Sequence, residues 1–176
     1  MRLFFALLPP RDLHAKLSQI MHGVHAARWQ SPQQLHLTLR FVGELGPAAA
    51  EELAALLPRT ISSVAPVSLS GVGYFAARGR PNALWVRAVP AEPLLHLHHK
   101  LDRICQAIGL TPERRAYLPH VTLARLSRHA GPIDDWIARN AGFTTGPVQF
   151  ERCGLMQSVQ GSEGSEYLQL ASVRLV

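Results

Sequence analysis

The sequence His36-Leu37-Thr38-Leu39 occurs a second time, with one apolar change, as His120-Val121-Thr122-Leu123. In an extended strand successive side chains point to opposite faces, so the His and the Thr of each copy share one face. Each copy therefore presents an imidazole and a hydroxyl together. A single copy is more typical of a packed or surface histidine than of a catalyst. The repetition is what suggests a paired site.

The segments around the two motifs also correspond. Pro47 follows the first motif at nearly the same distance as Pro132 follows the second, and each motif is preceded by a strand pattern and a helix pattern. A duplicated strand-helix-strand-helix unit explains this order. Because two like units pack most simply about a pseudo-two-fold axis, we expect a single domain over residues 1–176. It should have two lobes, with both His-Thr pairs lining one cleft.

Apolar spacing, glycines and prolines predict the individual elements. Strands are expected at 3–8, around the two motifs, at 67–74, 83–89, 147–155 and 167–176. Helices are expected from Pro10 to about Ala27, at 47–57, 93–108 and 133–140. Between the last two strands lies a segment rich in Gly and Ser, 157–166, which we expect to be a mobile loop over the cleft.

The composition is that of a folded globular protein: 47% hydrophobic and 17% charged residues, with a mean hydropathy of +0.05. No apolar run is as long as a membrane span, and Pro9-Pro10 ends the opening strand without a cleavage site after it. The two cysteines, Cys105 and Cys153, form neither a disulfide framework nor a zinc spacing. We therefore expect a cytoplasmic protein that does not associate with membranes.

The basic residues favour a polyanionic partner. The formal net charge is +6, and Lys16 and Lys100 are the only lysines, so nearly all of the positive charge is on arginine. The planar guanidinium can donate two hydrogen bonds to one phosphate. A compositional bias of the genome explains the arginines equally well, so the charge supports this partner class without proving it.

The motifs and their surroundings resemble the 2H phosphoesterase superfamily, and most closely its RNA 2′,3′-cyclic phosphodiesterases, also called 2′-5′ RNA ligases. The resemblance extends over nearly the whole chain and includes the segments 2–7, 35–44, 119–125 and 155–158, followed by Gly164 and Tyr167. It implies an α+β fold of two lobes, with antiparallel-rich sheets and outer helices. It also implies an active site formed by His36, Thr38, His120 and Thr122, with Arg125 as a further phosphate ligand.

Two imidazoles suit the opening of a cyclic phosphodiester. One must deprotonate the attacking water and the other must protonate the departing ribose oxygen, and both forms of histidine are accessible near neutral pH. Threonine hydroxyls can donate to the phosphoryl oxygens. The resemblance assigns His36 as proton donor, His120 as proton acceptor and a 2′-phosphomonoester as product, while the near-symmetric motifs leave the two roles open. The scheme needs neither a metal nor another cofactor.

The position of the arginine ligand is open at this stage. Strict alternation places Arg125 on the face opposite His120, so it reaches the phosphate only if the strand twists, ends or bulges just before it. Arg40, which alternation places on the His36 face, is the alternative.

Several other side chains have simpler interpretations. His96, His98 and His99 look like a metal cluster but have no carboxylate or Cys at ligand spacing, so we interpret them as solvated helix residues. Trp85, Trp136 and Phe41 fit core positions, although the place of Phe41 directly after the first motif leaves room for base contact. Trp29, in a loop seven residues before His36, is the tryptophan that we expect could stack on a base.

The principal hypothesis is hydrolysis of the 2′,3′-cyclic phosphate end of an RNA partner by a monomeric enzyme. Ligation, if it occurs, should be the ATP-independent reversal of this reaction, because the chain contains no phosphate-binding loop of the Gly-x-x-x-x-Gly-Lys type. Two alternatives remain. The same cleft could bind RNA ends without catalysis, or the enzyme could act on small cyclic nucleotides.

Overall fold

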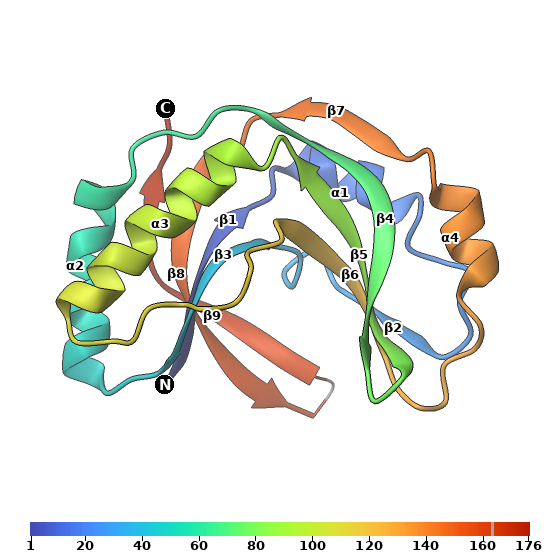
Figure 1. Cartoon of the computed structure of the whole chain (residues 1–176), viewed down its shortest axis with the longest axis horizontal. Coiled ribbons are helices and arrows are strands. Elements are labelled where there is room, and N and C mark those ends of the chain that lie inside the picture. Colours follow the sequence, from blue (N-terminus) through green and yellow to red (C-terminus); the bar gives the residue numbers. More distant parts are fainter. Residues whose placement is uncertain (163) are drawn as a thin grey trace.

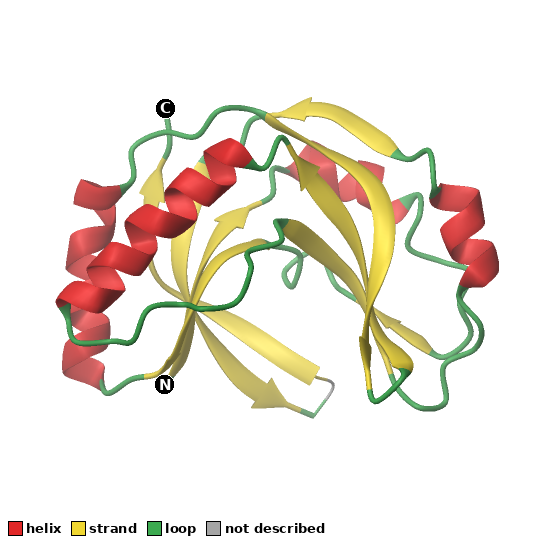
Figure 2. Cartoon of the chain, in the orientation of Figure 1, coloured by secondary structure: helices red, strands yellow, loops and turns green. Residues whose placement is uncertain are grey.

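The computed structural model describes residues 1–162 and 164–176 as an α+β fold (Figures 1 and 2). The helices are α1 (Arg11–Ser18), α2 (Pro47–Thr60), α3 (Glu92–Ala107) and α4 (Asp134–Asn140). The strands are β1 (Arg2–Leu8), β2 (Ala27–Trp29), β3 (Leu37–Glu44), β4 (Val67–Ala77), β5 (Arg80–Val89), β6 (His120–Leu126), β7 (Thr144–Val148), β8 (Arg152–Gly161) and β9 (Gly164–Arg174). None of the described helices is long and apolar enough to cross a membrane.

The strands form two lobes that meet at the motif strands. Their order is β7-β4-β5-β6-β3-β1-β8-β9, with β2 added beside β6, and the pairings described are all antiparallel. We call β3, β1, β8 and β9 the first lobe, and β6, β5, β4, β7 and β2 the second lobe. Within the described residues a single backbone pair joins β3 to β6. The two lobes diverge from this junction, as the ribbon in Figure 1 shows.

Two of the helices cross from one lobe to the other. α1 follows β1 of the first lobe but packs against β7 of the second, where Lys16 donates to the carbonyl of Thr145 over 3.0 Å. α3 follows β5 of the second lobe but packs on β3 of the first, beside α2 (Figure 1). α2 and α4 stay with the lobes of the strands before them. The two repeats are therefore interlocked, and each lobe is covered by a helix that the other supplies.

The core fills the helix-covered side of the sheet. Alternate residues of β1, Leu3, Phe5 and Leu7, are at most 1% exposed and belong to the main apolar cluster. The residues between them face the other side, where Phe4 and Ala6 pack with Met156 in a separate small cluster. This period of two is the strand signature that the sequence carries. It gives the sheet one buried face and one face that is available for a site.

Three predicted elements are wrong. The single strand expected over 147–155 is interrupted, because β7 ends at Val148 and β8 begins at Arg152. The helix expected to run to about Ala27 ends at Ser18, because Gly23 and Ala26 have positive φ values of 89° and 53° and residues 27–29 pair with β6. The loop expected over 157–166 is instead a β-hairpin, in which β8 continues to Gly161 and β9 begins at Gly164. Residue 163 of that expected loop lies outside the described residues. Regular pairing gives the hairpin backbone partners that a mobile loop lacks.

Candidate active site

The two motifs meet at the pair formed by Leu37 and Val121, which are fully buried on the core side. Directly opposed residues of an antiparallel pair project to the same face, and their chain neighbours project to the opposite face. The side chains on that opposite face are His36, Thr38, His120 and Thr122. In this register the histidines lie diagonally across the junction, a placement that typically puts residues about 7–8 Å apart, with their Cβ atoms somewhat closer. The structure therefore brings the four predicted side chains to one face.

The two imidazoles are oriented by equivalent hydrogen bonds. Nδ1 of His36 lies 2.7 Å from the carbonyl oxygen of Gln34, and Nδ1 of His120 lies 2.7 Å from that of Leu118. A carbonyl oxygen only accepts, so each Nδ1 carries a hydrogen and donates it. In the neutral rings Nε2 is therefore the unprotonated nitrogen. Each motif thus aims one basic nitrogen away from its own backbone.

Aromatic rings surround both imidazoles. The rings of Phe4 and Tyr167 each lie 4.9 Å from the His36 ring, measured between centroids. The ring of Phe75 lies 4.9 Å from that of His120, and the larger Trp85 ring lies 6.3 Å away. Apolar neighbours of this kind remove water from a charged group and disfavour its charged form.

Burial therefore lowers the pKa of both histidines. It lowers the pKa of His36 from 6.5 to about 4, against the hydrogen bond to Gln34, and the charges of Arg125 and His120 act in the same direction as burial. Burial also lowers the pKa of His120, against the hydrogen bond to Leu118, and Arg125 adds to the effect. Arg125 thus acts electrostatically on both imidazoles. Both rings are predominantly neutral at pH 7 in the free protein.

Each motif ends in a β-bulge at its fourth residue. On β3 the partners of Phe5 and Ala6 are Arg40 and Thr38, so Leu39 is the extra residue. On β6 the partners of Leu84 and Trp85 are Ala124 and Thr122, so Leu123 is the extra residue. A bulge shifts the alternation of all following side chains by one position. The residues after each motif therefore change faces.

The bulge on β6 places Arg125 on the face of the histidines. Ala124 and Leu126 are buried in the core, and Arg125 between them is exposed. It is also the Cα partner of Arg28 on β2. The sequence predicted that Arg125 could share the face of His120 only if the strand twisted, ended or bulged just before it. The bulge at Leu123 is such a feature.

The bulge on β3 has the opposite effect on Arg40, and its expected place on the His36 face is wrong. Arg40 is 6% exposed and donates from Nε to Asp102 of α3 over 2.7 Å. It also donates to the carbonyl oxygens of Thr111 and Phe41. Burial, the largest single effect, acts to raise the pKa of Asp102. The hydrogen bonds from Arg40, the Glu113 amide and Gln106, together with the charge of Arg40, outweigh it and lower the pKa. Arg40 therefore attaches the motif strand to α3, and Phe41 takes the exposed position in its place.

Asp102→Ala should lower the free energy of unfolding by about 3 kcal/mol, because it leaves the buried guanidinium of Arg40 without a counter-ion. Urea unfolding followed by circular dichroism measures the change. Glu52→Ala, which removes an exposed carboxylate from α2, is the matched control and should change stability by less than about 0.5 kcal/mol. Equal stabilities of the two variants would show that the Arg40–Asp102 pair does not hold the strand.

His98 on α3 lies in different surroundings from those expected. No group of three or more His, Cys, Asp or Glu side chains placed to hold a metal occurs in residues 1–162 and 164–176. His98 is not solvated as expected: it is 6% exposed, its Nδ1 donates to the carbonyl of Leu39 over 2.7 Å, and its ring stacks on Tyr117. The Tyr117 hydroxyl in turn donates to the carbonyl of Thr38 over 2.9 Å. The side chains of His98 and Tyr117 thus donate to backbone carbonyls of β3, a strand that forms a single backbone pair with β6 in the described residues.

The three tryptophans lie in different surroundings. Trp136 is buried as predicted, and its Nε1 donates to the carbonyl of Ile20. Trp29, considered for base contact, packs its ring 6.1 Å from that of Trp136. Trp85 is 8% exposed but lies on the site face beside His120, not in the main core.

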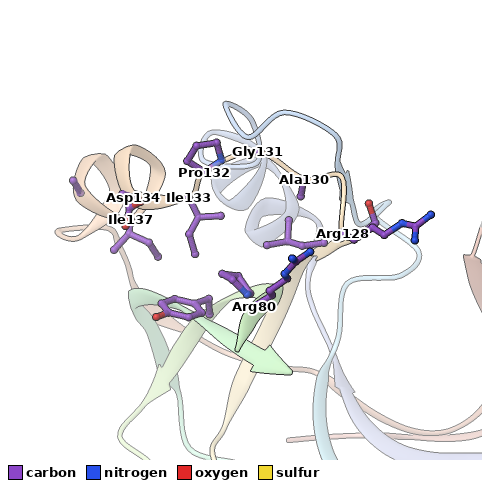
Figure 3. A pocket seen from close by; sticks show the side chains of 13 residues that line it. Arg80, Arg128, Ala130, Gly131, Pro132, Ile133, Asp134 and Ile137 are labelled. Atoms are coloured by element: carbon purple, nitrogen blue, oxygen red, sulfur yellow. The ribbon is translucent and has the colours of Figure 1, made fainter. Parts of the chain in front are cut away.

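Two cavities differ in their relation to the motifs. One of about 380 Å³ lies between the lobes and is lined by Thr38, His120, Phe41 and Phe75, with Arg115. Another, of about 580 Å³, lies between the β4–β5 hairpin and α4, with Arg80 near the hairpin and Ile133 and Ile137 on the α4 side (Figure 3). The second contains no predicted site residue. Of the residues predicted for the site, Thr38 and His120 line the first cavity, as does Arg40, whereas His36 does not.

Sequence reasoning missed the groups that orient and enclose the imidazoles. The carbonyls of Gln34 and Leu118 are backbone atoms and leave no signal in residue type. Phe4 and Phe75 are recognisable only once the facing strands are known. The regular alternation of β1 was the one available signal, since it places Phe4 on the face opposite to Leu3 and Phe5.

Comparison with known proteins gives a consistent result. The model of the 2′-5′ RNA ligase superfamily matches residues 9–159. The RNA 2′,3′-cyclic phosphodiesterase of Thermus thermophilus is 34% identical over 136 residues, covering 71% of this chain and 68% of the relative. That of Archaeoglobus fulgidus is 26% identical over 97% of this chain and 98% of its own. The crystal structure of TT0787 from Thermus thermophilus superimposes with a TM-score of 0.77 at 28% identity, covering 99% of this chain and 98% of that chain.

Proposed function

The chain belongs to the 2′-5′ RNA ligase superfamily, and we propose that it hydrolyses the 2′,3′-cyclic phosphate end of RNA to a 2′-phosphomonoester. The relatives at 34% and 26% identity are named for the cyclic phosphodiesterase activity. The observation that carries the proposal is the pair of imidazoles on one face, each with Nδ1 bonded to a carbonyl oxygen. Two such rings, one on each side of a phosphorus atom, can act as base and acid in the same reaction.

In the proposed reaction His120 accepts a proton from water as the water oxygen bonds to phosphorus. The bond between phosphorus and the ribose 3′ oxygen breaks, and His36 donates its proton to that oxygen. The hydroxyls of Thr38 and Thr122 donate to the non-bridging oxygens, and Arg125 stabilises the negative charge that collects there. One proton enters the pair as one leaves, so the atoms and charges balance.

The low pKa of His36 bears on its role as proton donor. His36 has the pKa of about 4 and is therefore neutral in the free protein at neutral pH. A phosphate anion between the rings favours the imidazolium form of either one and raises its pKa. His36 can serve as the proton donor only once substrate is bound, and we expect it to take up its proton as the anion binds.

The pH optimum of kcat/KM should therefore differ from the pH optimum of kcat. The singly protonated pair of the free enzyme is populated at acid pH, above about 4 and below the ordinary value of 6.5, because both pKa values are lowered. We expect kcat/KM to peak in this range and to fall as pH rises further, and kcat, which reports the complex, to peak at higher pH. Initial rates from about pH 4 to 9 measure both profiles. Coincident optima would contradict the proposed role of the substrate anion.

The cavity between the lobes suits the nucleoside of the RNA end. Phe41, which is 56% exposed, and Phe75 line it from opposite lobes, and Thr38 and His120 reach it as well. Exposed aromatic faces stack on bases without strong sequence preference. We expect the terminal base to lie between these rings while its cyclic phosphate lies at the histidines.

The test is turnover of an oligoribonucleotide with a 2′,3′-cyclic phosphate end, with the product identified by its position of phosphorylation. A 2′-phosphomonoester formed in the presence of a chelator is the expected result. Salt-dependent binding without turnover would instead identify a module that only holds RNA ends. A 3′-phosphomonoester would retain the hydrolase and overturn the assigned leaving group.

The remaining expectations concern the setting of the reaction. Ligation of a 5′-hydroxyl end to the cyclic phosphate is the reverse chemistry and needs no ATP. We expect the protein to act as a monomer in the cytoplasm.

The thiols of Cys105 and Cys153 are free and buried. Burial raises their pKa values to about 11 and about 12, which keeps them protonated and unreactive.

A further inference from the structure

Arg87 extends the site face by one strand beyond His120. The two residues are Cα partners on β5 and β6, so their side chains project to the same face. The row across the junction is therefore Arg87, His120 and Thr38. Arg87 is exposed, in contrast to its chain neighbours Val86 and Ala88, which are buried. The register thus presents a cation in the cleft beside the catalytic pair.

The guanidinium of Arg87 is held by an aromatic ring. Its central carbon lies 5.8 Å from the centroid of Trp85, and that ring also contacts His120 and Phe75. Trp85 fits there because Gly73 on β4 has no side chain: a Cβ at Gly73 would lie 2.3 Å from the indole. Stacking on an aromatic face limits the positions of the guanidinium without neutralising its charge.

Arg87 has no acidic partner in the described part of the chain. Within residues 1–162 and 164–176 the one ion pair closer than 4.0 Å is that of Arg40 with Asp102. Arg87 lies on β5, on the side of His120 away from the junction with β3. Its charge is therefore available to an anion that is not the one at the reacting phosphorus.

We propose that Arg87 binds the phosphodiester that precedes the terminal nucleotide, so that the preferred substrate is an RNA chain and not a mononucleotide. The inference rests on the proposed function, since the cyclic phosphate must occupy the histidines. The ribose that bears this phosphate is joined through its 5′ oxygen to the next phosphodiester. Arginine stacked on an aromatic ring is well suited to hold such a backbone group.

Arg87→Met tests this assignment. Methionine keeps an unbranched apolar stem over Trp85 and removes the charge. For a trinucleotide with a cyclic phosphate end we expect KM to rise about tenfold, the loss of one charge-assisted hydrogen bond, with kcat within about twofold. For a nucleoside 2′,3′-cyclic phosphate without a 5′ phosphate both parameters should be unchanged. The salt dependence of kcat/KM for the trinucleotide should also weaken by about one unit of slope.

Arg103→Met is the matched control, because Arg103 is an exposed arginine on α3. It should leave the kinetics of both substrates unchanged. An equal rise in KM for both substrates would place Arg87 at the terminal nucleotide and overturn the proposal, as would unchanged KM for the trinucleotide. Failure of the unaltered protein to open either substrate would overturn the proposed function itself, and this inference with it.

Discussion

His36→Ala and His120→Ala should each lower kcat by about three orders of magnitude, with KM changed much less. Each substitution removes a group that moves a proton in the transition state, and general acid or base catalysis contributes about 10²–10⁴-fold per group. In the proposed reaction each ring lies on its own side of the reacting phosphate, so loss of either would leave one oxygen without its proton donor or acceptor. Steady-state rates on a cyclic-phosphate oligonucleotide measure the effect.

The double variant distinguishes cooperation from separate contributions. Residues that act as a unit are strongly non-additive, so we expect the variant lacking both histidines to lose little more activity than either single variant. His22→Ala, at an exposed histidine after α1, should retain full activity. Thermal unfolding of each variant establishes that it is folded. A folded His36 or His120 variant with undiminished kcat would remove that residue from the mechanism.

Arg125→Ala should lower kcat/KM about a hundredfold, in keeping with the loss of one preorganised donor to a developing negative charge. Its effect on the histidines gives a second measurement. Because Arg125 lowers the pKa of both imidazoles, its removal should move the limbs of the kcat/KM profile to higher pH. A donor that acted through substrate contact alone would leave the limbs in place.

Arg128→Ala is the control for Arg125, since Arg128 is an exposed arginine in the segment directly after β6. It should change kcat/KM by less than about twofold. Thermal unfolding should show both variants to be as stable as the unaltered protein, because Arg125 is exposed and its removal opens no cavity. A large loss of stability in Arg125→Ala would identify a structural residue instead.

The motif strands could be predicted because their signal is local. The alternation of His, Leu or Val, and Thr fixes which side chains share a face, and the repetition indicates that two faces are combined. The same pattern places Leu37 and Val121 in the core, where the structure has them. The extent of α1 and the β8–β9 hairpin could not be predicted this way. Residues 27–29 pair with the distant strand β6, and β8 and β9 pair with each other around Gly161 and Gly164. The local composition of these two places is typical of a helix and of a loop.

The two arginines show where alternation fails. Counting by twos places Arg40 beside His36 and Arg125 away from His120, and the bulges at Leu39 and Leu123 reverse both. An inserted residue changes the pairing of two strands and requires no particular residue type, so it leaves little trace in one sequence. The resemblance to a known family kept Arg125 among the candidates when the spacing argued against it.

The crossing of α1 and α3 between the lobes has a consequence for how the chain can be divided. A fragment that ended between the repeats would retain strands whose covering helix belongs to the missing part, and would expose a wide apolar surface to water. We therefore expect neither fragment to fold by itself.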